Sequence, residues 1–329
     1  MNKLYILVAT SLIFPSLSIF AQQDTSYIPN GKPEIRIFTS ASSTFFQGEN
    51  FNKFDLNRAY LGYIQNFTKT LTGRVTLDFG NPSAGKLNYT AYLKFAYLQY
   101  HIGKFFLTGG MIPLPHYEVG DTKWGYRYVY RTFFDDHGFG TSADLGISVV
   151  YKFTPRFGAD LTLVNGEGFK LAETDSAVRV GLGITLIPVK NLTLRGFFDT
   201  MKKEEVNQQT TELMASYENR KIAVAYGWYS QKDHALVADH DYQGMTLNAS
   251  LLLKKNVKIF ARFDDLTSEK TGNAQNPWNY AKDGRLYLAG IEIPISPGIK
   301  LSPNFMCLDP ADASIPSSSR ISLNLDVKY

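Results

Sequence analysis

Cysteine is almost absent from this chain. The 329 residues include one, Cys307, so no disulfide bond can form within the chain. Export without disulfides fits a bacterial envelope better than a eukaryotic secreted scaffold.

Long apolar runs are missing after residue 21, so no transmembrane helix is expected. No stretch shows a convincing helical period over three turns. If the chain enters a membrane, it must do so as a closed barrel, because lipid tolerates no unpaired backbone.

Strong charge is also lacking. The net charge is +4 and no basic run occurs, so the sequence gives no reason to expect nucleic acid as a partner.

Histidine is scarce, with five in the chain, and no serine near one has the context of a catalytic triad. The triplets Asp135-Asp136-His137 and Asp239-His240-Asp241 contain metal-ligand types, but on loops such groups are usually solvated surface. We therefore expect no enzyme activity, no cofactor and no metal.

The abundant residues are those of a β protein. There are 20 Tyr, 23 Phe and 26 Gly, and 44% of residues are hydrophobic, so a large apolar surface must be buried or placed in lipid. Residues 1–21, "MNKLYILVATSLIFPSLSIFA", have a lysine, an apolar run and a final alanine, which predicts a signal peptide. We divide the chain into a signal peptide (1–21) and one barrel domain (22–329).

Apolar and polar residues alternate with a period of two throughout the chain. The alternation predicts sixteen strands, at 34–44, 55–66, 70–79, 91–101, 104–111, 142–153, 156–164, 176–187, 191–200, 208–217, 220–230, 242–253, 256–265, 283–294, 298–307 and 319–329.

The connections alternate between short ones, such as "FTK", "IG" and "PVK", and long ones, such as "FFQGENFNKF" and "MKKEEVN". Tight turns on one rim and long loops on the other are typical of outer-membrane barrels. The longest connection, residues 112–141, stands apart from the rest.

The two strand faces differ in polarity. In 176–187 the residues Val178, Val180, Leu182, Ile184 and Leu186 oppose Ala177, Arg179, Gly181, Gly183 and Thr185. Lipid outside and water inside satisfies both faces. In 283–294 the pattern changes phase near Gly290, which predicts a β-bulge there, because Leu286 and Leu288 cannot share a face with Ile291 in a regular strand.

The last strand, "SRISLNLDVKY", alternates up to Tyr329. We expect it to close the barrel by pairing with the first strand. A terminal aromatic on such a strand resembles the signal that the outer-membrane assembly machinery recognises, which makes that machinery an expected partner through Tyr329.

Several segments resemble the phosphate-selective porin O and P family. They are "FDLNRAYLGYIQNFTKTLTGRVTLDFG", "AYLQYHIGKFFLTGGMIPLPHYE", "GISVVYKF" and "LVNGEGFK", and together they cover roughly residues 55–170. The resemblance implies a 16-stranded homotrimeric porin whose third loop folds into the lumen to narrow the channel. It also suggests phosphate as a solute.

On the predicted inward face, sixteen bases outnumber ten acids, and seven of these bases are predicted to line the pore. We expect the pore to be lined by Arg36, Arg58, Arg74, Lys94, Arg179, Arg195 and Arg262. Inward acids are also predicted, at Glu34, Asp78, Asp144, Asp160, Asp199, Glu212, Asp264, Asp283, Glu292 and Asp326. Fixed charges of this kind set ion selectivity through their field.

The predicted constriction loop carries Lys123, Arg127, Arg131, Asp135 and Asp136. In "YRYVYR", a strand-like period would place Arg127, Val129 and Arg131 on one face. These arginines would either attract anions or pair with Asp135 and Asp136 and pin the loop to the wall.

The leading interpretation is therefore an all-β transmembrane barrel of about 16 antiparallel strands in the outer membrane of a Gram-negative bacterium. It would act as a porin for small hydrophilic solutes with a mild anion preference. The alternatives are a barrel enzyme such as a lipid hydrolase, and a non-conducting structural or binding barrel. The expected partners are outer-membrane lipid, small solutes or anions, and two further copies of the chain.

Overall fold

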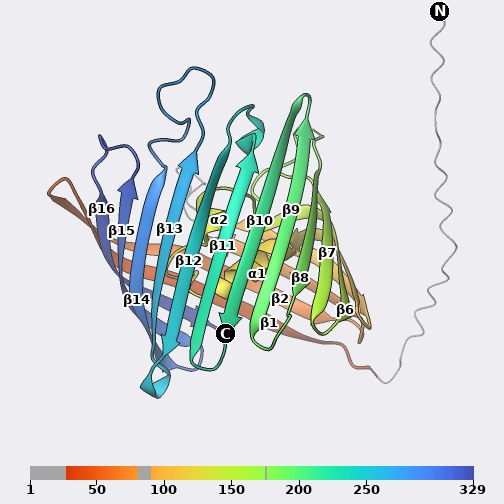
Figure 1. Cartoon of the computed structure of the whole chain (residues 1–329). Coiled ribbons are helices and arrows are strands. Elements are labelled where there is room, and N and C mark those ends of the chain that lie inside the picture. Colours follow the sequence, from red (N-terminus) through yellow and green to blue (C-terminus); the bar gives the residue numbers. More distant parts are fainter. Residues whose placement is uncertain (1–26, 81–89, 175) are drawn as a thin grey trace, which may run out of the picture.

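The computed structural model describes residues 27–80, 90–174 and 176–329. The predicted signal peptide lies outside these residues. Among the described residues, sixteen strands form one closed antiparallel barrel in which each strand pairs with its neighbours in the sequence (Figure 1). The strands are β1 (Asn30–Phe46), β2 (Glu49–Asn66), β3 (Leu71–Phe79), β4 (Tyr92–Ile102), β5 (Phe105–Pro113), β6 (Ala143–Thr154), β7 (Phe157–Val164), β8 (Arg179–Leu186), β9 (Leu192–Lys203), β10 (Val206–Glu218), β11 (Ile222–Lys232), β12 (Tyr242–Leu252), β13 (Lys258–Ser268), β14 (Gly284–Ser296), β15 (Ile299–Pro310) and β16 (Ser318–Lys328).

Short helices occur in the connections. They are α1 (Pro115–Trp124) and α2 (Phe133–Asp136) between β5 and β6, and the 3-10 turns η2 (His234–Leu236) and η3 (Lys254–Asn256). No helix in the described part of the chain is both long and apolar enough to cross a membrane.

The barrel closes between its first and last strands, as predicted. β1 pairs with β16 in a continuous register from Arg36 opposite Lys328 to Phe45 opposite Ser319. Beyond the strand, the backbone N–H of Tyr329 donates to the carbonyl oxygen of Ile35 at 2.9 Å. Closure leaves no unpaired sheet edge, which is the condition for a sheet to lie in lipid.

Burial in the wall is inverted relative to a water-soluble protein. Along β10 the polar side chains Gln208, Thr210 and Glu212 are buried, whereas Leu213 is 54% exposed. On β8 the residues Val180 and Leu182 are likewise exposed. The outer surface is thus apolar and the inner surface polar, which fits a membrane barrel.

Exposed aromatic rings gather at the turn between β6 and β7. Phe153 and Phe157 stack with ring centroids 4.7 Å apart, and Tyr151 packs edge-on against Phe153. Amphipathic and aromatic rings favour the membrane interface, so this cluster suits one rim of the barrel.

Two connections predicted to be long are tight turns. β1 and β2 are joined by Gln47 and Gly48, which have φ of 52° and 82°. β9 and β10 are joined by Glu204 and Glu205, with Glu204 at φ 53°. Polar strand residues keep pairing past the apolar belt, so both hairpins extend farther than the apolar alternation indicates.

The predicted bulge near Gly290 is wrong. β14 keeps a regular register with β15 from Gly284 through Pro294, and the shift occurs between Pro294 and Ser296. Leu286 and Leu288 are buried on the inner side, whereas Tyr287 and Ile291 are exposed. The inner face of this strand is simply apolar, because another segment of the chain packs on it.

Candidate functional site

That segment is the β5–β6 segment, residues 114–142, which carries α1 and α2. Pro115 begins α1, where its missing N–H costs nothing. Gly125, at φ 72°, ends α1 and donates its N–H to the carbonyl oxygen of Asp121. Thr132 caps α2 by accepting the N–H of Asp135.

Apolar side chains of the β5–β6 segment pack on the wall in two clusters. Phe133, Phe134 and Phe139 contact wall residues Tyr229 of β11 and Tyr242 of β12. The second cluster places Trp124, Tyr126 and Tyr128 against Phe38 of β1, Phe260 of β13, and Leu286 and Leu288 of β14. The segment thus touches strands around much of the ring.

Four hydrogen bonds from wall side chains hold the backbone of the β5–β6 segment. Arg262 donates to the carbonyl oxygen of Arg131, and Tyr242 to that of His137 at 2.7 Å. Gln231 donates to Phe139 O at 2.8 Å, and Asn324 to Tyr128 O at 2.9 Å. Because donors come from β11, β12, β13 and β16, the segment is fixed at several points of the wall.

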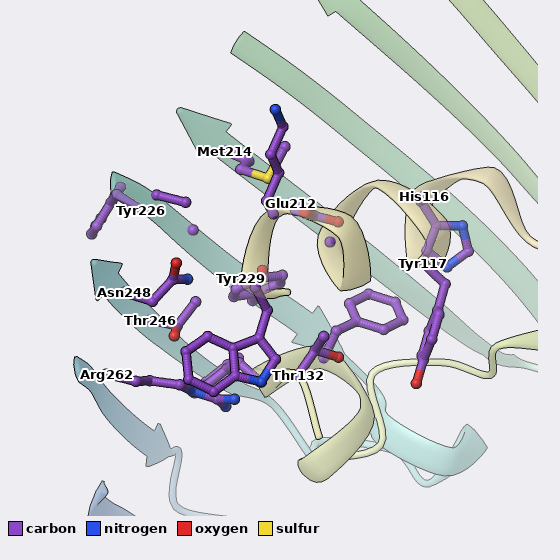
Figure 2. Close-up of a pocket in the computed structure, with 17 residues that line it drawn as sticks. His116, Tyr117, Thr132, Glu212, Met214, Tyr226, Tyr229, Thr246, Asn248 and Arg262 are labelled. Atoms are coloured by element: carbon purple, nitrogen blue, oxygen red, sulfur yellow. The ribbon is translucent and has the colours of Figure 1, made fainter. Parts of the chain in front are cut away.

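One side of the interior is nearly filled. Figure 2 shows Glu212, Tyr229, Thr246 and Arg262 of β10 to β13 facing His116, Tyr117 and Thr132 of the β5–β6 segment. The space between them is about 20 Å³, room for roughly one water molecule. His116 stacks on Phe197 of β9 at 4.0 Å, and its two ring nitrogens are buried without a partner among the described residues.

Three of the bases predicted to line the pore lie on this filled side. Arg179, Arg195 and Arg262 are 11%, 1% and 1% exposed. They pair with Asp199 at 3.2 Å, Asp160 at 2.7 Å and Asp264 at 2.6 Å, respectively. They lie on the inner side of the wall, but the β5–β6 segment covers them, so they do not face the open space.

Gly183 explains how the Arg195–Asp160 pair fits against the wall. A Cβ at this position would lie 2.3 Å from Arg195 Nη2 and 2.6 Å from the Asp160 carboxylate. The sequence placed Gly183 on the polar face, and the structure shows that only glycine leaves room there for the paired side chains.

The other four predicted bases lie on the open side, formed by β1 to β4 and β16. Arg36 bonds to Asp326 at 3.1 Å, Arg58 to Asp78, and Arg74 to Glu34 at 2.5 Å. Lys94 donates to the Tyr60 hydroxyl at 3.3 Å and lies over its ring. Three of the four positive charges are therefore matched by inward-facing carboxylates.

Two hollows lie between the β5–β6 segment and this open wall. The first, about 500 Å³, is lined by β1, β2, β16 and residues 127–131. The second, about 230 Å³, is lined by β1 to β4 and residues 117–127. Both are lined by Phe38 of the wall and Arg127 of the segment, so they meet at this pair.

The charged residues of the predicted constriction loop pair mainly with one another. Arg127 lies 3.0 Å from Asp135 and 3.3 Å from Asp121, and Arg131 lies 3.6 Å from Asp136. Lys123 reaches Glu218 of β10 at 3.4 Å. Burial alone would raise the pKa of the Asp135 carboxyl, but Arg127 and Arg131 lower it below its usual value.

The strand-like period predicted for "YRYVYR" is wrong. The stretch turns back on itself, with the N–H groups of Val129 and Tyr130 both donating to the Tyr126 carbonyl oxygen. Val129 is buried in an apolar cluster, whereas the Arg131 side chain is 51% exposed. The two arginines therefore differ: Arg127 is enclosed and Arg131 is accessible.

Sequence reasoning missed the apolar inner residues that receive the β5–β6 segment, such as Phe260 and Leu286. The signal lies in the apolar residues of β14, whose change of phase indicates an apolar inner face and not a bulge. It also missed Lys170, which lines the first hollow. In the described part of the chain, no three His, Cys, Asp or Glu side chains are grouped as a metal site requires, and no histidine bonds to a serine.

No known protein-family profile and no curated protein sequence matches this chain. Solved structures, however, match this chain in fold. A Pseudomonas putida OprB structure has a TM-score of 0.69 at 10% identity, covering 91% of this chain and 94% of that one. An anion-selective porin from Comamonas acidovorans has a TM-score of 0.65 at 12% identity, covering 92% and 100%.

A trimer form of OmpT, an outer membrane protein of Vibrio cholerae, has a TM-score of 0.59 at 9% identity, covering 91% and 99%. At these identities the likeness establishes the fold, which is that of outer-membrane porins. It does not single out the phosphate-selective group among them.

Proposed function

We propose that this chain is a porin of a Gram-negative outer membrane, through which small hydrophilic solutes diffuse passively. The observation that carries the proposal is the pair of polar hollows that meet at Phe38 and Arg127 inside a wall with an apolar outer face. In this proposal the β5–β6 segment narrows the channel to the side formed by β1 to β4 and β16.

The proposed solute path has a mild preference for anions. Arg127 and Arg131 face the first hollow together with Arg58 and Lys170 of the wall and a neighbouring loop. The preference is mild because most bases have acidic partners, and paired charges largely cancel at a distance under physiological salt. Phosphate is one anion to compare with chloride.

We further infer a homotrimer, since one outer membrane protein of similar fold has a trimer form. An apolar hollow of about 360 Å³ lies over β2 to β5 and is lined by Phe67, Gly73, Leu98 and Gly109. These small and apolar residues offer a place for a neighbouring copy. The barrel would be delivered to its membrane by the signal peptide and assembled through its last strand.

The test is conductance of the purified protein in a planar lipid bilayer, combined with fractionation of cells that produce it. Stepwise ion conductance and recovery in the outer membrane are the expected results. Recovery as a soluble periplasmic protein would exclude the barrel in a membrane, and insertion without conductance would favour a structural or binding barrel instead.

A further inference from the structure

The first hollow is lined by two kinds of polar side chain, uncharged ones on the barrel wall and basic ones around them. Its wall carries short uncharged polar side chains, Ser40, Ser42, Asn57 and Ser322. Ser42 stands directly across from Ser322 in the register of β1 and β16. Ser40 donates to the Asn57 amide oxygen at 3.2 Å. Hydroxyls and amides of this kind both donate and accept hydrogen bonds, so they suit the hydroxyls of a solute.

Basic side chains line the same hollow. Several already have carboxylate partners: Lys53 lies 2.8 Å from Asp55, and Arg58 pairs with Asp78. Arg127 pairs with Asp135, and Arg131 has a longer contact with Asp136. These bases form ion pairs around the hollow, and the paired carboxylates compensate most of their charge.

Arg320 on β16 is different. Within the described residues, no carboxylate lies within ion-pair distance of it. Its Nε is buried and has no hydrogen-bond acceptor. Its Nη2 meets only the Met306 sulfur, at 3.5 Å, and its guanidinium lies 5.7 Å from the Tyr130 ring. A guanidinium can present N–H groups to a carboxylate, and among the described residues no acidic side chain compensates the charge of Arg320.

We propose that this hollow is a binding site for hydroxylated carboxylates, the class that includes hexuronic and aldonic acids. The carboxylate binds Arg320 with support from Arg131, and the solute hydroxyls bind Ser42, Ser322 and Asn57. The volume of about 500 Å³ is within the range of about 300–1,000 Å³ for small-molecule sites. The inference rests on the channel proposed above and names the solutes that it favours.

Neither simpler ligand class uses the whole site. A small anion such as acetate would engage Arg320 but leave the serine-rich wall to water. A neutral sugar would bond to that wall but leave the guanidinium without a counter-charge. A sugar acid satisfies both sides at once, and recognition of this kind depends on a few convergent polar groups.

The experiment measures how D-glucuronate, D-glucose and acetate block current through single channels at constant ionic strength. We expect glucuronate to block at concentrations at least about tenfold below the other two, because a charge-assisted hydrogen bond and several neutral ones act together. Equal block by acetate, or equal block by glucose, would overturn the proposal.

Point variants then test whether glucuronate blocks the current by binding in the first hollow. Arg320→Gln should raise the half-blocking glucuronate concentration about tenfold, and Arg320→Lys should restore only part of the loss because the forked geometry is gone. The double variant Ser42→Ala, Ser322→Ala should weaken glucuronate block about threefold and leave acetate unaffected. Arg285→Gln is the control for net charge, since it removes a positive charge from an exposed position on β14 outside the hollow, where Arg285 pairs with Asp265 at 3.8 Å.

Failure of the binding-site proposal and failure of the channel proposal give different experimental results. A protein that conducts potassium chloride but shows no difference among the three solutes remains a porin and lacks this site. A folded barrel that conducts no ions overturns the channel itself. If Arg320→Gln and Arg285→Gln change the block equally, the block reflects net charge, and the proposed site is wrong.

Discussion

The Arg127 guanidinium lies 3.0 Å from the Asp135 carboxylate, and both residues belong to the β5–β6 segment. Arg127 also bonds to the hydroxyl of Tyr117 and to Asp121. The pairing therefore stabilises the fold of the segment itself, whereas the attachment to the wall depends on other residues, Arg262 among them.

The first prediction separates the two loop arginines. Arg127→Ser should raise conductance, because it breaks enclosed ion pairs and loosens the segment, at a cost of about 3–5 kcal/mol. Arg131→Ser should instead move the reversal potential in a potassium chloride gradient toward cations, because the Arg131 side chain is accessible. Planar-bilayer recording measures both quantities. A reversal-potential shift for neither variant would mean that these arginines do not select ions.

The second prediction concerns the attachment of the segment. Arg262→Leu leaves Asp264 buried and unpaired, and should destabilise the barrel by about 3–5 kcal/mol. Removing both charges, as Arg262→Leu with Asp264→Leu, should cost less than Arg262→Leu alone. The temperature at which heat-modifiable migration is lost in gels measures this. Equal losses would show that the backbone bond to Arg131, and not the ion pair, carries the effect.

The third prediction concerns Tyr329, whose side chain is 80% exposed while its backbone pairs with Ile35. Tyr329→Asp should keep the backbone bonds but remove the aromatic that the assembly machinery would recognise. We expect normal refolding in detergent micelles and much less folded protein in the outer membrane of cells. Unchanged amounts in cells would show that the side chain is not a recognition signal. Poor refolding in detergent would point to a closure defect.

The fourth prediction is a pH dependence in the loops above the wall. Trp278 stacks on His240 at 4.4 Å and on His234 at 5.5 Å. Burial, followed by the nearby charges of His240 and Arg179, lowers the pKa of His234 to about 4. Because the folded pKa is depressed below the usual value of about 6.5, the unfolded chain takes up a proton first. The stacked arrangement should therefore lose stability as pH falls from about 6.5 to about 4.

Tryptophan fluorescence during an acid titration measures this change. A transition that is present in the wild type and missing in both Trp278→Phe and His234→Asn is the expected result. A midpoint near 6.5 would mean that His234 is solvated. Conductance recorded across the same range shows whether the loop cluster, through Tyr242 and His137, affects the channel.

The sequence alone determined the wall. A period of two is a local property of the chain, so sixteen strands and their outward-facing apolar residues, such as Leu182 and Ile184, could be predicted, and so could the closing pair of β1 and β16. The apolar alternation does not locate tight turns such as Gln47–Gly48, because strand pairing continues where that alternation has ended.

Only the tertiary structure decided what occupies the interior. Whether an inward arginine faces water or protein depends on where the β5–β6 segment lies, and residues far away in the sequence fix that position. Arg195 and Arg36 look alike in their strands, yet one is enclosed under the segment and the other borders an open hollow. The carboxylates opposite them come from other strands, so the number of uncompensated charges follows from barrel register and packing, which no local pattern encodes.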